Sequence, residues 1–377
     1  MRKRMIAAAV LLVCIVALPV LPAAAEDCSA RSMIVYEPRT GTVLAEQNAD
    51  EELLVASTTK IMTALVVLEH CALQETVTAT AAQAAVEGSS MYLKAGETYT
   101  VDELLYGLIL ASGNDAATAL AEHTAGSCES FAKLMNDKCA ALGLQHSHFA
   151  NPHGLDAEGH YSSARDLAVI TAAAMENPDF CRIFSTRHYT VHGVSYENHN
   201  KLLSSCEGCI GGKTGYTKAA GRVLVSCAER NGFRLICVTI SDANDWEDHR
   251  SAYDAAFGQY RYVSLPEEHW REIEVNSGCS ASVPLCCGVP GVVLPKNVTA
   301  VIRTELPRFV FAPILPGQEL GRVTVTADGK KLFTAPVYCA AGTELDVSVP
   351  LTAKERFQRS WELYCRYGIY RVYPMYY

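Results

Sequence analysis

The chain is poor in positive charge. It holds 32 Lys and Arg residues against 41 Asp and Glu residues, so its formal net charge is −9 at neutral pH. The basic residues form no concentrated stripe along the sequence. Proteins that bind nucleic acid need clustered cations, because these neutralise phosphates and release counterions. We therefore expect no nucleic-acid partner.

Two catalytic motifs are absent as well. No G-x-S-x-G segment occurs, which argues against the nucleophile elbow of an α/β-hydrolase. Gly212-Lys213-Thr214 is similar to the end of a phosphate-binding loop, but that motif needs a glycine where Glu207 stands. The sequence therefore excludes a nucleotide-binding loop at this position.

The fifteen cysteines lack any repeating spacing that would indicate a disulfide framework. Cys206 and Cys209 form the one local C-x-x-C pair. No thioredoxin-like βαβ pattern surrounds this pair, and a zinc site would need a second pair or a ligand besides the isolated His199. We expect either a local disulfide or free thiols at these two positions.

Residues 1–25 are typical of a secretory signal peptide. Three basic residues precede an apolar stretch, and Ala23-Ala24-Ala25 fits an A-x-A cleavage site. A retained membrane helix is the alternative, but the apolar stretch is short and small residues follow it. Cleavage before Glu26 would leave 29 basic and 41 acidic residues, a net charge of −12. We expect an extracytoplasmic protein, secreted to the cell wall or to the outer face of the cytoplasmic membrane.

Residues 26–265 are expected to form an α+β domain. Runs of β-branched and apolar residues predict strands over 33–36, 42–44, 223–225 and 235–240. Between them, the apolar spacing predicts a helix from Thr58 to Glu69, and the Ala- and Leu-rich residues 100–142 predict further helices. Strands at both ends of a helical region are typical of the α+β class.

Residues 266–350 are expected to form a small all-β domain. Short β-rich runs are separated there by turn pairs such as Pro290-Gly291 and Asp328-Gly329. Residues 322–326 alternate with the period of a strand.

Residues 351–377 have a different composition, with five basic residues against two acidic ones. Phe357, Trp361 and Tyr364 fall on one helical face. This mixture fits an amphipathic tail at a membrane surface. A C-terminal helix that is frayed, or packed on its domain, is the other interpretation.

Ser57-Thr58-Thr59-Lys60 is the strongest chemical signal in the chain. A spacing of three on a helix places the side chains of Ser57 and Lys60 on one face. A serine hydroxyl is a poor nucleophile until a base takes its proton. Lysine can act as that base only when it is neutral, so its pKa must fall through burial or a nearby cation. Lys213 is the candidate for that cation.

Two later segments complete a pattern around this one. They are Ser112-Gly113-Asn114 and Lys213-Thr214-Gly215. Each of the three motifs is weak alone, because Ser, Gly and Asn also mark helix starts and turns. In this order, however, they form the S-x-x-K, S-x-N and K-T-G set that class A β-lactamases share with penicillin-binding proteins.

Longer runs extend the likeness, and together they resemble the serine-type D-alanyl-D-alanine carboxypeptidases, the low-molecular-mass penicillin-binding proteins. The matching runs are residues 56–64, 110–116, 151–156, 160–166 and 212–217. The likeness spans roughly residues 30 to 260 and is looser over 312–318. The resemblance implies a β-lactamase/transpeptidase-like domain, an antiparallel sheet with a helical subdomain, followed by a small all-β domain.

The resemblance also implies a role for each motif residue. Ser57 would attack the carbonyl between two D-alanines of a peptidoglycan stem peptide, and Lys60 would accept its proton. Ser112 would relay a proton to the leaving D-alanine nitrogen. Asn114 would hydrogen-bond the substrate backbone or Lys60.

The same resemblance assigns the substrate-binding strand. Lys213, Thr214 and Gly215 would hold the terminal carboxylate and the peptide edge. The backbone N–H groups of Ser57 and Tyr216 would form the oxyanion hole. Water would release the acyl-enzyme, so no metal or organic cofactor is expected. Penicillin would acylate Ser57 as a covalent inhibitor that mimics the substrate.

Three other functions stay open. A serine β-lactamase would need a glutamate for fast deacylation, and residues 197–200 are a poor match to the E-x-x-L-N segment that supplies it. A D,D-endopeptidase or transpeptidase would differ only in leaving group or acceptor. A wall-binding protein could keep the fold without the chemistry. His153 and His160 are expected to be structural, because Lys60 already supplies a base.

Overall fold

The computed structural model describes residues 28–265, 272–346, 352–367 and 370–376. The predicted signal peptide lies outside these residues. The chain divides into two compact units between Tyr260 and Arg261. Of the helices that are described, none combines the length and apolarity that crossing a bilayer requires.

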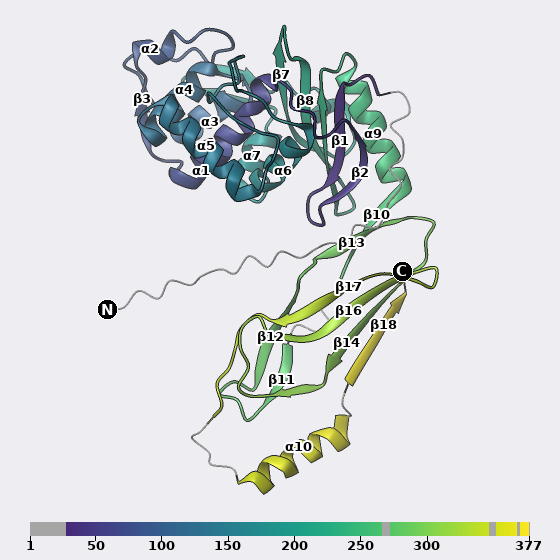
Figure 1. The fold of residues 1–377 in the computed structure, drawn as a ribbon. Coiled ribbons are helices and arrows are strands. Elements are labelled where there is room, and N and C mark those ends of the chain that lie inside the picture. Colours follow the sequence, from purple (N-terminus) through teal and green to yellow (C-terminus); the bar gives the residue numbers. More distant parts are fainter. Residues whose placement is uncertain (1–27, 266–271, 347–351, 368–369, 377) are drawn as a thin grey trace, which may run out of the picture. The chain divides into compact units, whose positions relative to one another are not determined.

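The larger unit is built on an antiparallel five-stranded sheet with the order β2-β1-β9-β8-β7 (Figure 1). Its strands are β1 (Ser32–Glu37), β2 (Thr42–Gln47), β7 (Cys209–Thr217), β8 (Gly221–Arg230) and β9 (Phe233–Ile240). Ile236 and Val238 join the main apolar core, and Cys237 between them is buried as well. Burial of successive residues means that both faces of the sheet are covered.

Helices provide that cover. They are α1 (Lys60–His70), α3 (Val101–Ile109), α4 (Asn114–Ala125), α5 (Cys128–Leu142), α6 (Ala164–Ala174), α7 (Pro178–Ser185) and α9 (Asp245–Gln259). Figure 1 shows α9 on one side of the sheet and the other long helices on the opposite side. Both α6 and α9 contact β9. Apolar side chains of α1 lie at the centre of the helical group.

Short elements connect these helices and strands. They are the 3₁₀ turn η1 (Ala56–Thr59) and the short helices α2 (Ala81–Ala84) and α8 (Leu202–Ser205). Two antiparallel strand pairs accompany them, β3 (Thr76–Thr78) with β4 (Thr98–Thr100) and β5 (His188–Val191) with β6 (Val194–Glu197).

Local sequence explains where several helices begin. Thr100 and Glu103 form a reciprocal capping box at the start of α3. Ser163 accepts a hydrogen bond from the backbone N–H of Asp166 and caps α6. Asn177 caps α7 and Pro178 follows it at the first helical position, where a missing N–H costs nothing.

The predicted α+β class is confirmed, as are the strands and the helical region over 100–142. The predicted helix from Thr58 begins instead at Lys60, because η1 occupies residues 56–59 with tighter 3₁₀ geometry.

The smaller unit is rich in strands. A seven-stranded sheet has the order β15-β11-β12-β17-β16-β14-β18, and β10 pairs separately with β13. The strands are β10 (Tyr260–Ser264), β11 (Glu272–Asn276), β12 (Ser282–Cys287), β13 (Gly291–Pro295), β14 (Ala300–Pro307), β15 (Phe309–Phe311), β16 (Glu319–Ala327), β17 (Lys330–Cys339) and β18 (Tyr370–Tyr376). Val323 and Val325 of β16 are buried in its core, as strand alternation predicts.

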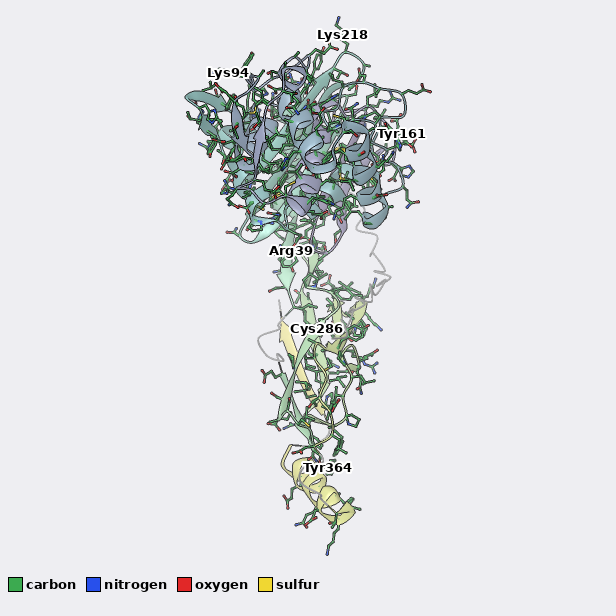
Figure 2. All side chains as sticks on the ribbon, turned by 90° about the vertical axis from the view of Figure 1, so that its left-hand side faces the viewer. Arg39, Lys94, Tyr161, Lys218, Cys286 and Tyr364 are labelled. Carbon is green, nitrogen blue, oxygen red and sulfur yellow. The ribbon has the colours of Figure 1, made fainter. Side chains whose placement is uncertain are left out.

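The segment expected as an amphipathic tail contains the helix α10 (Ala353–Tyr367) and then β18, which pairs with β14. Phe357, Trp361 and Tyr364 are exposed along this helix, and their rings contact one another in sequence. Figure 2 shows Tyr364 on the helix and Cys286 on the strands of the same unit. A membrane role for α10 stays a prediction.

Candidate active site

Ser57 lies in the tight turn that leads into α1. It belongs to η1, and the residue before it, Ala56, has a positive φ of 46°. In a 3₁₀ turn, side chains three positions apart eclipse one another. The Oγ of Ser57 therefore lies 2.9 Å from the Nζ of Lys60, the first residue of α1. Ser57 is half-buried, so its hydroxyl remains reachable from solvent.

Lys60 is fully buried, and its nitrogen has three partners. Besides Ser57, Nζ donates to Oδ1 of Asn114 at 2.8 Å and to the backbone carbonyl of His153 at 2.6 Å. Both of these oxygens can only accept. A neutral amine has two N–H groups and one lone pair. Once the N–H groups are used on Asn114 and His153, the lone pair is left for the hydroxyl proton of Ser57.

Burial and charge both favour that neutral form. The pKa of Lys60 is held well below its usual range, first by burial and then by the nearby ammonium of Lys213, while Asp115 acts in the opposite direction. Burial also lowers the pKa of Lys213 to about 7. The predicted convergence of Ser57, Lys60 and Lys213 at one site is thus seen in the fold.

Ser112 faces Lys213 from the turn between α3 and α4. The Nζ of Lys213 donates to Oγ of Ser112 at 3.0 Å and to the backbone oxygen of Thr214 at 2.8 Å. Ser112 has a positive φ of 58°, a conformation that is strained for a residue with a side chain. Strain of this kind is common where a structure holds a side chain in a required position.

Asn114 is held on its other side by a backbone group. Its Nδ2 donates to the carbonyl of Glu87 at 2.8 Å, which orients Oδ1 toward Lys60. Gly88 follows, and a Cβ there would lie 2.6 Å from Nδ2 of Asn114. The next residue of α4, Asp115, accepts hydrogen bonds from Ser90 and from the backbone of Met91 and Leu93. Asp115 therefore ties the 87–93 loop to the site, a role that the sequence motif did not indicate.

The turn over residues 151–154 closes the site beneath Lys60. Pro152 accepts a hydrogen bond from Thr63 of α1, and His153 accepts from Lys60. Gly154 has a φ of 84°, and a Cβ at this position would lie 1.9 Å from the carbonyl oxygen of Ala56. Only glycine permits so close an approach.

The strand β7 is the edge of its sheet and passes beside the nucleophile. A Cβ on Gly215 would lie 3.0 Å from the backbone nitrogen of Ser57, so the two backbones are adjacent. Thr214 is half-buried, and the Tyr216 side chain is 66% exposed. An edge strand can pair with an extended peptide through its free backbone groups.

A cavity of about 550 Å³ opens at this edge. It is lined by Ser57, Ser89, Ser112, His199, Lys201, Thr214, Gly215, Tyr216, Arg222, Asp245 and Trp246. The catalytic and strand residues in that set were predicted from the motifs. Ser89, His199, Lys201, Arg222, Asp245 and Trp246 were not, because they come from separate segments without a recognisable spacing.

Arg222 and Asp245 form a two-point ion pair in the cavity wall. The guanidinium donates from Nε at 3.0 Å and from Nη2 at 2.6 Å to the two carboxylate oxygens. It also lies 5.7 Å from the ring centroid of Trp246. These contacts fix the position of the Arg222 cation in the wall.

The two histidines behave as expected for structural groups. Nδ1 of His160 accepts from the backbone of Ala150, so Nε2 carries the proton and donates to Thr59 at 2.9 Å. Nδ1 of His153 accepts from the backbone of Leu155. Burial lowers the pKa of each ring to about 4, so both are neutral at pH 7.

The structure also decides between the two states expected for the local C-x-x-C pair. Cys206 and Cys209 are free thiols, one of the two alternatives.

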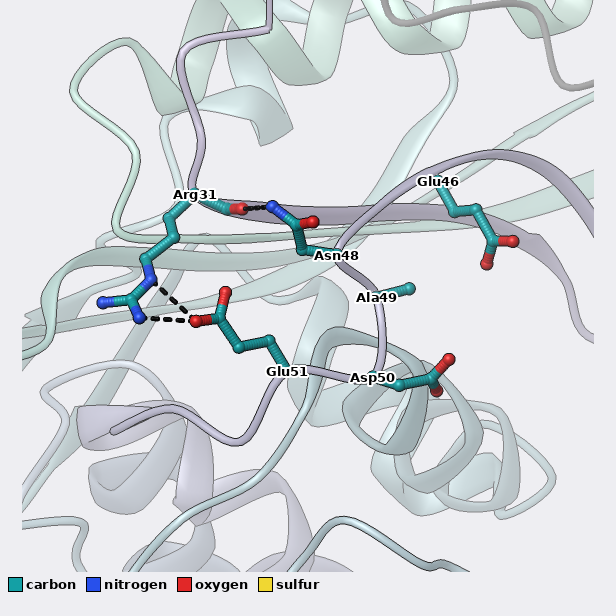
Figure 3. A pocket seen from close by; sticks show the side chains of 6 residues that line it. All are labelled: Arg31, Glu46, Asn48, Ala49, Asp50 and Glu51. Atoms are coloured by element: carbon teal, nitrogen blue, oxygen red, sulfur yellow. Dashed lines mark hydrogen bonds and ion pairs between the residues drawn. The ribbon is translucent and has the colours of Figure 1, made fainter.

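A second hollow of about 700 Å³ lies around Arg31 and Glu51 (Figure 3). Its charged side chains are already paired, with Arg31 to Glu51 and with Glu46 and Asp50 to Arg165. This hollow contains no candidate nucleophile among its lining residues.

Comparison with known proteins agrees with this geometry. The D-alanyl-D-alanine carboxypeptidase family of peptidases matches residues 20–244. The D-alanyl-D-alanine carboxypeptidase DacF of Bacillus subtilis is 33% identical over 351 residues, covering 88% of this chain and 90% of that protein. DacC of Escherichia coli is 34% identical over 343 residues, covering 85% and 86%.

Solved structures are similar as well. Penicillin-binding protein 5 of Haemophilus influenzae superposes with a TM-score of 0.70 at 29% identity, covering 84% of this chain and 98% of that one. A mutant of the Streptomyces K15 DD-transpeptidase superposes with a TM-score of 0.59 at 34% identity, covering 62% and 99%. The second match is confined to a smaller share of this chain.

Proposed function

Because the chain belongs to the D-alanyl-D-alanine carboxypeptidase family of serine-type peptidases, we propose that it removes the terminal D-alanine from peptidoglycan stem pentapeptides through an acyl-enzyme on Ser57. The hydrogen-bond pattern of Lys60 carries this proposal. Its N–H groups have two obligate acceptors, so the lone pair of the neutral amine is directed at the Ser57 hydroxyl.

Acylation begins when Ser57 attacks the carbonyl carbon between the two D-alanines. Its proton passes to Nζ of Lys60, and the carbonyl oxygen becomes an oxyanion. The backbone N–H groups of Ser57 and Tyr216 stabilise that charge. The adjacency of Gly215 to the nitrogen of Ser57 supports this pairing of donors.

The leaving D-alanine needs a proton on its nitrogen. Ser112 relays to that nitrogen the proton that Lys60 took from Ser57, so Lys60 is neutral again once the D-alanine leaves. The Nζ of Lys213 donates to Oγ of Ser112 at 3.0 Å and orients this hydroxyl. Lys213 and Thr214 hold the carboxylate at the end of the substrate, and the edge of β7 pairs with its backbone. Water, activated by Lys60, then hydrolyses the ester of Ser57 and restores the enzyme.

Two enzymatic alternatives remain. A β-lactamase of class A type would use a glutamate through water. The carboxylate in the cavity wall, Asp245, is instead paired with Arg222. The similarity to the Streptomyces K15 DD-transpeptidase supports transpeptidation as the second alternative. Transpeptidation differs from the carboxypeptidase reaction only in that an amine replaces water as the acceptor of the acyl group. A wall-binding protein without chemistry predicts no covalent adduct with penicillin.

The proposed extracytoplasmic location is supported by the residues at the N-terminus. A signal peptide over residues 1–25 would deliver the enzyme to the compartment that holds its substrate. The exposed aromatic side chains of α10 support a peripheral contact with the membrane surface.

Two measurements test the proposal. The intact protein is exposed to benzylpenicillin, and the adduct is mapped by mass spectrometry; we expect it on the peptide that contains Ser57. Incubation with a stem pentapeptide should release D-alanine. The Ser57→Ala variant should lose both reactions, whereas Ser251→Ala, at an exposed position of α9, should keep both. An intact pentapeptide together with rapid hydrolysis of a chromogenic cephalosporin would favour the β-lactamase.

A further inference from the structure

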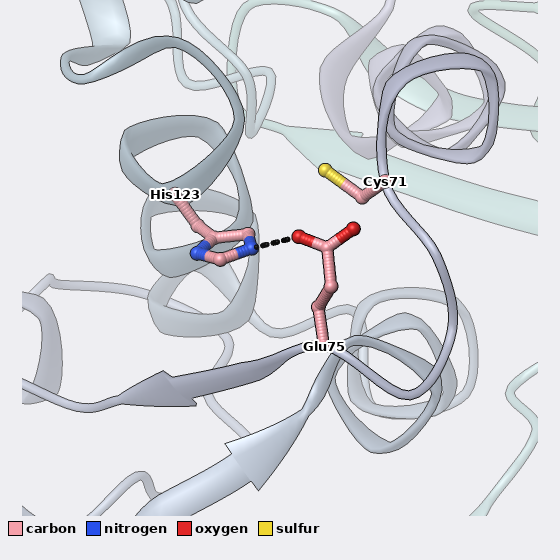
Figure 4. A group of neighbouring side chains, drawn as sticks. All are labelled: Cys71, Glu75 and His123. Carbon is pink, nitrogen blue, oxygen red and sulfur yellow. Dashed lines mark hydrogen bonds and ion pairs between the residues drawn. The ribbon is translucent and has the colours of Figure 1, made fainter.

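The described part of the chain contains two groups of thiol, carboxylate and imidazole side chains whose residues do not line the catalytic cavity. The first consists of Cys71, Glu75 and His123 (Figure 4). Nε2 of His123 and Oε2 of Glu75 are 2.9 Å apart, in a direct hydrogen bond. A tetrahedral zinc would separate such nitrogen and oxygen ligands by about 3.3 Å. Cys71 is also paired, with Thr124. The polar atoms of this first group are therefore satisfied by hydrogen bonds.

The second group consists of Cys28, Asp242 and Asp248, whose ligand atoms all lie within 4.8 Å of one another. Asp242 follows the end of β9, and Asp248 lies in the first turns of α9. Asp242 is only 1% exposed, and its Oδ2 has no hydrogen-bond partner among the described residues. A buried carboxylate oxygen without a partner is costly, so a group that binds it would stabilise the fold.

No basic side chain of the described residues pairs with the carboxyl groups of this second group. Neither Asp242 nor Asp248 takes part in an ion pair with any Lys, Arg or His that the structure describes. The donors that reach them are neutral. Oγ of Ser29 lies 2.7 Å from Asp242 and 2.9 Å from Asp248, and the backbone N–H of Ser29 donates to Asp248 at 2.8 Å. The two adjacent carboxyl groups are therefore held by uncharged donors.

We propose that Cys28, Asp242 and Asp248 bind a divalent cation of the zinc class. Thiolate sulfur selects zinc or cobalt over calcium and magnesium. Zinc binds sulfur at about 2.3 Å and carboxylate oxygen at about 2.0 Å, so tetrahedral geometry separates these ligand atoms by about 3.5 Å. The Sγ of Cys28 lies 3.5 Å from Oδ2 of Asp248, to which the thiol donates a hydrogen bond, and metal binding would replace that hydrogen bond. On binding, the thiol releases its proton to solvent and the sulfur bonds the metal.

The site has a structural consequence for the cleft. It joins the segment at residues 28–29 to the loop between β9 and α9. Asp245 and Trp246, at the start of α9, line the catalytic cavity. A bound cation would thus stabilise one wall of that cavity, while no step of the reaction uses it. The site is independent of the proposed function.

Cobalt provides a direct test, because a thiolate bound to Co²⁺ gives a near-ultraviolet charge-transfer band. The purified full chain, kept reduced with a non-thiol reductant, is stripped with a chelator and titrated with Co²⁺ or Zn²⁺. We expect the band to appear and Zn²⁺ to raise the melting temperature. Cys28→Ser should abolish the band. Asp242→Asn should weaken Co²⁺ affinity by more than about tenfold, since loss of a group that only orients a ligand already costs about 10–100-fold.

Cys71→Ser is the matched control, because it removes a thiol from the first group. It should keep the band, the affinity and the zinc-dependent rise in melting temperature. The proposal is wrong if Co²⁺ produces no thiolate band, if the band survives in Cys28→Ser, or if it is lost in Cys71→Ser. An unchanged Co²⁺ affinity in a folded Asp242→Asn variant would also overturn the proposal. A proton shared between Asp242 and Asp248 would then explain why the two carboxyl groups lie together. Far-ultraviolet circular dichroism establishes folding of each variant.

Discussion

The Nζ of Lys213 lies 3.0 Å from the Oγ of Ser112, although 101 residues separate them in the sequence. Lys213 comes from the edge strand β7, and Ser112 from the turn between α3 and α4. The contact therefore joins the sheet to the helical group across the cleft. It also brings the charge of Lys213 close enough to lower the pKa of Lys60.

The neutral amine of Lys60 can be tested by a substitution that keeps a cation. Lys60→Arg should lower the rate of acylation by penicillin by about 10²–10⁴-fold, because a guanidinium does not lose its proton and cannot act as a base. Stopped-flow measurement with a fluorescent penicillin gives the rate. Lys138→Arg, on α5 and away from the cleft, should acylate normally. Normal acylation by Lys60→Arg would exclude Lys60 as the base.

Asn114→Asp would place a carboxylate where an amide oxygen now lies 2.8 Å from Nζ of Lys60. A negative charge at this distance favours the ammonium and raises the pKa of Lys60. The acidic limb of the pH profile for acylation should move to higher pH by about one unit or more. Asn114→Ala, which adds no charge, should slow acylation without this displacement. An unchanged profile in Asn114→Asp would contradict the proposed role of neutral Lys60.

Gly154→Ala should both destabilise the protein and impair acylation. Its Cβ would lie 1.9 Å from the carbonyl oxygen of Ala56, which precedes the nucleophile. Gly143→Ala is a matched control, since its φ is also positive and no atom lies within 4 Å of its Cβ. The control should lose about 1–2 kcal/mol of unfolding free energy from backbone strain alone. Gly154→Ala should lose more, as measured by denaturant unfolding; equal losses would show that the contact with Ala56 is unimportant.

The neutral state of His160 predicts a loss of stability in acid. Burial lowers its pKa from an ordinary value of 6.5 to about 4. Between these values the unfolded chain binds more protons than the folded one, so stability is complete above pH 6.5 and falls as the pH drops toward 4. His160→Gln should remove up to about 3 kcal/mol of this dependence. Unfolding curves of both proteins are measured at pH 7 and pH 4.5. If the parent and His160→Gln lose the same unfolding free energy between these pH values, His160 is not the cause of the loss.

The exposed aromatic side chains of α10 predict binding to a membrane surface. Replacing Phe357 and Trp361 together by Ser should lower the affinity for anionic phospholipid vesicles by at least about tenfold, because each buried aromatic contributes more than 1 kcal/mol. Vesicle co-sedimentation measures this affinity. Phe311→Ser, at another exposed aromatic of the smaller unit, should bind normally. If the double variant binds as well as the parent, α10 is not the contact surface.

The sequence predicted the catalytic residues of the site better than it predicted the groups that hold those residues in position. Ser57, Lys60 and the later motifs could be recognised because each has a fixed local spacing. The supports could not, since Glu87 and His153 contribute backbone carbonyls, which any residue type carries. Arg222 lies on β8 and Asp245 at the start of α9. No fixed spacing in the sequence indicates that both residues line the cavity wall.

By itself, the sequence determined that a serine and a lysine share one turn, because local geometry fixes contacts over three residues. Only the tertiary structure decided that this lysine is buried and that Asn114 and His153 use its N–H groups. Whether an amine is charged depends on solvent exclusion and on charges brought from distant segments. Those quantities exist only after α1, α4 and β7 have packed together.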